Sequence, residues 1–127
     1  MDTSKLKYTE THEWVSVSGN SATVGITDHA QKEISDVVFI ELAKVGRAVK
    51  AKESVMVIES VKAAFDIYAP VSGKITTVNE KLQAKPELVN QAPYGDGWLF
   101  KMECTDPKEL DLLLTEDQYR NTSHSAH

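Results

Sequence analysis

The sequence predicts a mainly β fold with short peripheral helices and a C-terminal helix, because strand patterns fill its first two thirds. Residues 13–17 and 22–26 alternate apolar and polar side chains around the turn residues 18–21, which is the pattern of a β-hairpin. Two similar segments, 45–50 and 71–76, each enter an alternating strand from a turn that contains glycine. Since they bracket a central hairpin at similar distances, they indicate two similar halves packed around a pseudo-two-fold axis.

Capping residues and hydrophobicity place the next two elements. Thr27 and Asp28 supply N-cap chemistry, and Gln31 follows Asp28 by three residues as in a capping box. This predicts a short helix that ends near Ile34. Residues 37–42 are almost continuously apolar, so we expect a strand that is buried on both faces.

The last third of the chain is predicted to contain short elements separated by loops. The first of these are a helical turn at 86–90, a loop at 94–97 and a closing strand at 98–102. A helix then starts at Asp106, with an apolar stripe of Leu110, Leu113 and Leu114, and a second short helix starts at Thr115. The polar tail at 121–127 is expected to be frayed. No low-complexity linker divides the chain, so residues 1–127 are expected to form one domain.

Charge and cysteine content narrow the class of protein. The formal net charge is −5, and the two arginines, Arg47 and Arg120, lie in no basic cluster, so we expect no binding to nucleic acid. A single cysteine, Cys104, rules out an intrachain disulfide and suits a reducing compartment. The N-terminus has no secretory or transit pattern, and no run approaches the ~18 apolar residues of a membrane span. We therefore expect a cytoplasmic bacterial protein, or a processed form in the mitochondrial matrix, without membrane contact.

The sequence lacks the patterns of common active sites and metal sites. It contains no nucleotide-binding glycine motif, no nucleophile elbow and no HExxH pair. Its histidines, His12, His29, His124 and His127, are not spaced as a ligand set, so no metal site is predicted. The chain is expected to be a non-catalytic carrier, adaptor or regulator.

Lys62 is the strongest candidate for a functional residue. It lies between two strand patterns at the tip of a predicted hairpin, where the small Ala63 and Ala64 leave space around its ammonium group. Glu59 and Asp66 add a negative rim, which is either a recognition feature for a modifying enzyme or ordinary solvated charge. Because these carboxylates favour the charged ammonium, acylation of Lys62 would need an enzyme and an activated acyl donor.

Several motifs together resemble the glycine cleavage system H-protein family, in its order. The lysine hairpin is similar to the lipoylation hairpin of that family, and the resemblance covers roughly residues 6–120. The matching segments are 12–15, 24–31, 36–39, 59–63, 66–73, 86–90 and 93–98. The resemblance implies a barrel-sandwich hybrid, in which two small sheets pack face to face and a hairpin presents the modified lysine.

The resemblance also implies a cofactor and partners. Lipoate would be attached to Lys62 in amide linkage by a lipoate-attaching enzyme, which would recognise Glu59 and Asp66. The monomeric carrier would take the aminomethyl group of glycine from a pyridoxal-phosphate glycine decarboxylase to a tetrahydrofolate-dependent aminomethyltransferase. Dihydrolipoamide dehydrogenase would then reoxidise the cofactor. In such a system the cofactor carries the chemistry and the protein supplies its position.

A surface cleft that shields the loaded arm from water is a further implication of the resemblance. Its walls would be Glu13, Ile26, Glu33, Ile34 and Asp66. A carboxylate would pair with the aminomethyl ammonium, and the two isoleucines would pack on the lipoyl chain. Judged from the residues alone, both isoleucines fit the protein core equally well.

Two positions depart from the family pattern. Some relatives have a histidine where Glu33 stands. Phe65 occupies a position where a small polar residue such as serine is expected. An aromatic ring there would either pack on the arm or alter docking of the lipoylating enzyme.

Other carriers and roles share parts of this pattern. A lipoyl domain of a 2-oxo acid dehydrogenase usually has Asp-Lys-Ala at the tip and a biotin carrier has Met-Lys-Met, whereas Lys62 is flanked by Val61 and Ala63. A lipoyl relay protein, which donates its lipoyl group to other lipoate-dependent enzymes, fits the same residues. A structural or interaction domain with an unmodified Lys62 is the last alternative.

Overall fold

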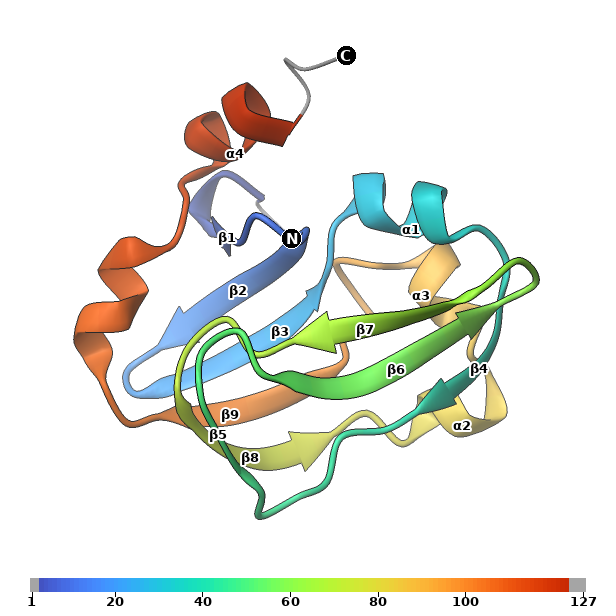
Figure 1. Ribbon diagram of the computed structural model, residues 1–127, viewed down its shortest axis with the longest axis horizontal. Coiled ribbons are helices and arrows are strands. Elements are labelled where there is room, and N and C mark those ends of the chain that lie inside the picture. Colours follow the sequence, from blue (N-terminus) through green and yellow to red (C-terminus); the bar gives the residue numbers. More distant parts are fainter. Residues whose placement is uncertain (1–2, 124–127) are drawn as a thin grey trace.

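Two antiparallel β-sheets form the centre of the molecule in the computed structural model, which describes residues 3–123 (Figure 1). The larger sheet has six strands in the order β1-β2-β3-β9-β8-β5, and the smaller has three in the order β4-β6-β7. The strands are β1 Lys7–Tyr8, β2 Glu13–Ser18, β3 Ser21–Ile26, β4 Val37–Glu41, β5 Ala48–Val49, β6 Ser54–Ser60, β7 Ala64–Tyr68, β8 Gly73–Val78 and β9 Phe100–Cys104. The prediction of a mainly β fold is confirmed.

Short helices surround the sheets. The α-helices are α1 Asp28–Ile34, α2 Lys81–Ala84, α3 Leu88–Gln91 and α4 Glu116–Ser123, and the 3-10 helices are η1 Thr3–Lys5 and η2 Pro107–Leu112. Among the described residues, no helix has the length and apolar character required to cross a membrane.

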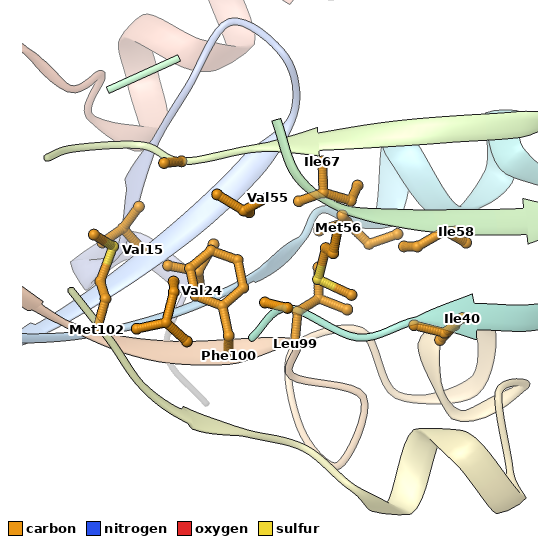
Figure 2. Packing of buried hydrophobic residues seen from close by; sticks show 14 of the residues in the cluster. Val15, Val24, Ile40, Val55, Met56, Ile58, Ile67, Leu99, Phe100 and Met102 are labelled. Atoms are coloured by element: carbon orange, nitrogen blue, oxygen red, sulfur yellow. The ribbon is translucent and has the colours of Figure 1, made fainter. Parts of the chain in front are cut away.

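The core lies between the two sheets. Apolar side chains from β2, β3 and β9 face those of β6 and β7 across the interface (Figure 2). Val24 and Phe100 on one side, and Ile58 on the other, are completely buried. Each such side chain contributes roughly 1.5–3 kcal/mol of transfer free energy, so the contact between the sheets is the main source of stability.

The predicted first hairpin is confirmed, and its register has a packing reason. Strands β2 and β3 pair around a turn that contains Gly19 at φ 61°. Trp14 is paired with Gly25, and a Cβ at Gly25 would lie 2.5 Å from the indole ring. Only glycine therefore lets the buried indole lie across β3, where its Nε1 donates a hydrogen bond of 2.9 Å to the carbonyl of Pro93.

The two similar segments of the sequence pair with each other. Strand β5 lies at the edge of the larger sheet beside β8, with Val49 opposite Gly73. The amide of Gly46 extends the pairing by donating to the Ile75 carbonyl at 2.7 Å.

Strand β4 corrects one expectation from the sequence. We predicted that it is buried on both faces, but Val38 and Phe39 are 55% and 54% exposed. The strand is an edge of the smaller sheet, and its pairing with β6 shifts register between Val37 and Phe39. A bulge at this point turns two consecutive side chains to solvent.

The C-terminal third also differs from its predicted boundaries. The closing strand begins at Phe100 instead of Trp98. The helical turn predicted at 86–90 corresponds to α3. Helix α2, which precedes it, was not predicted. Asp106 caps a helix as expected, accepting from the Lys108 amide, but the helix is 3-10. Helix α4 continues to Ser123, three residues into the predicted polar tail, whereas residues 124–127 lie outside the described chain.

Candidate functional site

Lys62 lies exposed at the tip of the β6–β7 hairpin, and the backbone beneath it is fixed by Ser60 (Figure 1). The Ser60 amide donates to the Ala63 carbonyl at 2.8 Å. The amides of Lys62 and Ala63 both donate to the Ser60 hydroxyl, at 3.2 and 3.3 Å. A serine hydroxyl that accepts from the following amides closes a tight turn. The lysine side chain is therefore accessible on a well-defined backbone.

The tip is also tied to the body of the protein. The amide of Val61 donates to the carbonyl of Asp36 at 3.0 Å. Asn90, in α3, holds the neighbouring segment, because its side chain accepts from the Val37 amide at 2.9 Å and donates to the Ser35 carbonyl at 2.7 Å. No pattern in the sequence indicates this role, since Asn90 and the segment that it holds are far apart in the chain.

Exposed apolar side chains lie at the tip and on the neighbouring edge strand β4. Val61, beside Lys62, is 66% exposed, and Val38 and Phe39 lie on the edge strand that pairs with the end of β6. We call Val38, Phe39 and Val61 the apolar collar. A group of exposed apolar side chains next to a candidate modification site is typical of a docking surface.

Glu59 and Asp66 lie on the outward face of the hairpin. Glu59 is paired with Ala64, and Asp66 is two residues further along β7, so the two acidic residues are diagonal neighbours. Both are exposed, and Asp66 accepts a hydrogen bond of 2.9 Å from the Ser54 hydroxyl. The negative rim expected from the sequence is therefore present on one face.

Phe65 lies on the opposite face of β7 from Asp66. It is paired with Ile58, is partly buried and packs against the core. The aromatic ring therefore takes part in packing the hairpin on the core.

Glu13 is a buried carboxylate at the start of β2, with 1% of its surface exposed. The hydroxyls of Thr9 and Thr11 donate to its Oε1, and the amide of Tyr68 donates to its Oε2 at 3.3 Å. Burial raises the pKa of the Glu13 carboxyl, and these hydrogen bonds oppose that shift. Because Tyr68 ends β7, Glu13 also connects the two sheets.

A cavity of about 440 Å³ opens beside Glu13. Strand β7 leads from the lysine tip to this cavity, where Tyr68, Ala69 and Pro70 form one wall. Leu113, which follows η2, also lines the cavity. Most of the lining is apolar and Glu13 is its buried carboxylate, while the other charged residues of the lining are Glu10, Lys52 and Glu109.

The other four residues of the expected cleft do not line this cavity. Ile26 and Ile34 are 1% and 5% exposed and belong to the core, and Ile26 pairs with Glu13 across β2 and β3. Glu33 is on the surface of α1, where its carboxylate lies 3.0 Å from Nε2 of His29. Cavity positions were not predicted for Tyr68, Pro70 and Leu113, since none of these residues carries a chemical signature in the sequence.

Comparison with known proteins assigns the family. A family model described as glycine cleavage H-protein matches residues 6–126. The chain belongs to the glycine cleavage H-protein family. A glycine cleavage system H protein from Thermotoga maritima is 60% identical over 114 residues, which cover 90% of this chain and 92% of the relative. One from Methylacidiphilum infernorum is 58% identical over 113 residues, covering 89% and 88% of the two chains.

A solved structure of the same family agrees with the fold. The crystal structure of a glycine cleavage system H protein from Mycobacterium marinum has a TM-score of 0.85 and 35% identity, and the match covers 93% of this chain and 95% of the other. The predicted barrel-sandwich hybrid is confirmed. Membership of this family makes the chain a lipoyl carrier component of the glycine cleavage system.

Proposed function

We propose that the protein carries lipoate in amide linkage on Lys62, and that it shuttles the aminomethyl group of glycine between enzymes. The donor would be a pyridoxal-phosphate glycine decarboxylase and the acceptor enzyme a tetrahydrofolate-dependent aminomethyltransferase, with dihydrolipoamide dehydrogenase restoring the oxidised cofactor. The observation that carries the proposal is an exposed lysine on a turn fixed by Ser60 and Asp36. When attached, lipoate supplies the disulfide chemistry, and the protein supplies its position.

The surroundings of Lys62 fit an attached acyl chain. Amide formation joins Nζ to the lipoate carboxyl carbon and expels the leaving group of an activated acyl donor. The small Ala63 beside the lysine and the exposed tip leave room for the attaching enzyme. Glu59 and Asp66 would contact that enzyme, since both project from the outward face of the hairpin.

Glu13 and its cavity are proposed to receive the loaded arm. The apolar walls would exclude water from the lipoyl chain, and the Glu13 carboxylate would pair with the terminal ammonium. Asp66 lies along β7 between the tip and the cavity, where a passing cation would meet it. Ile26 and Ile34 would support this region from the core, and Ile26 would act by positioning Glu13.

Mass spectrometry tests the proposal directly. The full chain is incubated with a lipoate ligase, ATP and lipoic acid, and its intact mass and peptide map are recorded. We expect one lipoyl-amide mass increment that maps to Lys62, after which the protein supports glycine decarboxylase turnover. A folded protein that remains unmodified, or one modified at another lysine, would contradict the proposal.

Replacement of Phe39 by serine should slow lipoylation without unfolding the protein. An enzyme that binds Lys62 and the adjacent edge strand would cover the apolar collar, and one buried aromatic ring contributes roughly 1.5–3 kcal/mol to such a contact. We expect kcat/KM for lipoylation to fall about tenfold or more.

Val17→Ser is the matched control for Phe39→Ser. Val17 is 41% exposed on β2, in the other sheet, so its loss should leave lipoylation unchanged. Equal rates for the two variants would show that the attaching enzyme does not use the apolar collar.

A further inference from the structure

We propose that His12, His29 and Glu33 form a binding site for a divalent transition metal ion of the zinc class. Each of these residues offers one ligand atom, and the three atoms lie within 4.8 Å of one another. His12 lies in the loop before β2, whereas His29 and Glu33 lie on α1, so the fold brings a loop residue beside two residues of a helix. The site is separate from Lys62 and does not depend on lipoylation.

The two ligands on α1 already have the spacing of a metal-bound pair. Nε2 of His29 lies 3.0 Å from Oε1 of Glu33. Two ligand atoms bound to one ion at about 2.1 Å are roughly 3.0–3.4 Å apart. Residues at positions i and i+4 share one face of a helix, so both side chains can reach the same ion. The His12 ring completes the set, with its centroid 4.5 Å from that of His29.

His12 is held by the kind of outer contact that orients a metal-binding imidazole. Its Nδ1 lies 2.7 Å from the hydroxyl of Tyr119, and that hydroxyl also lies 2.8 Å from Oγ1 of Thr27. Tyr119 is itself fixed, because it is buried and stacks on Tyr8 at a centroid distance of 4.8 Å. Metal-binding histidines commonly make such a contact through the second ring nitrogen. His12 would therefore bind the ion through Nε2.

The backbone fixes the position of His12 relative to α1. The carbonyl of His12 accepts from the amide of Thr27 at 3.0 Å, and Thr27 is the N-cap of α1. The amide of His12 donates to the Thr9 carbonyl at 3.2 Å. Binding an ion would thus require side-chain adjustments but no backbone rearrangement.

The donor set selects the class of ion. Two imidazole nitrogens and one carboxylate oxygen suit Zn²⁺ and similar borderline ions better than Ca²⁺ or Mg²⁺, which prefer oxygen ligands. The side chains of His29 and Glu33 are 24% and 58% exposed, so an ion would keep contact with solvent through its remaining coordination positions. A metal bound in this way would exchange, unlike one enclosed by four protein ligands.

A cavity of about 320 Å³ beside the site provides access. His29 and Tyr119 are among its lining residues. Lys32 and Arg120 also line it, but their charges are opposed by nearby carboxylates. Lys32 lies 3.1 Å from Asp28, and Arg120 lies 3.6 Å from Glu116.

Calorimetric titration of the full, unlipoylated chain with Zn²⁺ tests the proposal. Because His124 and His127 in the C-terminal sequence can also bind metal, the reference protein carries His124→Asn and His127→Asn. We expect this reference to bind one Zn²⁺, and His29→Gln and Glu33→Gln made in it to bind at least tenfold more weakly. Saturating Zn²⁺ should raise the Tm of the reference and not that of His29→Gln.

Tyr119→Phe tests whether the Tyr119 hydroxyl orients the His12 ring for metal binding, independently of the packing of the Tyr119 ring. The substitution keeps the buried ring and removes the hydroxyl, and we expect Zn²⁺ affinity to fall about tenfold, within the range seen when an outer hydrogen bond to a metal-bound histidine is lost. Co²⁺ bound to the reference should show visible absorption bands that are altered in this variant. Lack of Zn²⁺ binding by the reference, or equal affinity for the reference and His29→Gln, would overturn the proposal.

Discussion

Lys62→Ala abolishes lipoylation and glycine decarboxylase turnover while the fold remains intact. This is the result that we expect, because no other side chain of the tip can form the amide and because an exposed tip residue contributes little to stability. The free energy of unfolding should change by less than about 0.5 kcal/mol. Lipoylation is followed by intact mass, turnover by decarboxylation of glycine in the reconstituted system, and stability by urea denaturation.

Two lysine variants act as controls. Lys62→Arg keeps the positive charge and should be as inactive as Lys62→Ala, which would show that the amine nitrogen and not the charge is required. Lys74→Arg changes another exposed lysine, on β8, and should remain fully active. Unfolding of Lys62→Ala would mean that Lys62 is a structural residue.

Glu13→Ala should destabilise the protein by about 2–3 kcal/mol and reduce carrier activity. Removal of the carboxylate leaves the hydroxyls of Thr9 and Thr11 and the amide of Tyr68 without their acceptor in a buried place. Glu13→Gln keeps one oxygen, which can still accept from the two threonine hydroxyls, but its amide nitrogen would face the Tyr68 amide and leave that donor without an acceptor. Its cost should therefore be smaller than that of Glu13→Ala, about 1 kcal/mol. Urea denaturation compares the two variants, and equal stability would contradict a structural role for these hydrogen bonds.

A comparison of the wild type with Glu13→Gln tests the raised pKa of Glu13. The ordinary pKa of a glutamate is 4.5, and the folded state raises it, so ionisation is harder in the folded than in the unfolded chain. Stability should therefore fall as the pH rises from about 4.5 through the pKa of the folded state. Glu13→Gln cannot titrate, so the unfolding free energy of the wild type should fall relative to that of this variant over this range. A constant difference between pH 4 and 8 would contradict the raised pKa.

Local patterns in the sequence were sufficient to predict some elements. The first hairpin follows from alternation on both sides of a turn at Gly19, and α1 follows from the cap at Thr27, so each depends on residues that are close in sequence. The position of Lys62 at a hairpin tip was likewise visible, because both strands and the turn lie within one short segment.

Other features depend on residues that are remote in the chain. The exposure of Phe39 results from its place on a sheet edge and from a bulge, neither of which hydrophobicity reveals. The buried carboxylate of Glu13 accepts a hydrogen bond from the amide of Tyr68 at the end of β7. A glutamate at the start of a strand gives no sign of such a remote partner. The cluster of His12, His29 and Glu33 requires the loop before β2 to lie against α1, so only the spacing of the last two residues could have suggested it.

The hydrogen bonds that join the tip to the body also affect how a flexible arm would meet its targets. The amide of Val61 is hydrogen-bonded to the carbonyl of Asp36, and Asn90 holds the segment around Asp36. The backbone of the tip that carries Lys62 therefore moves together with the body of the protein. The arm's own length alone then sets the volume that its free end explores. A smaller volume gives a higher effective concentration at any enzyme docked within reach. Transfer between partners would thus be governed by where each one docks and not by motion of the carrier's backbone.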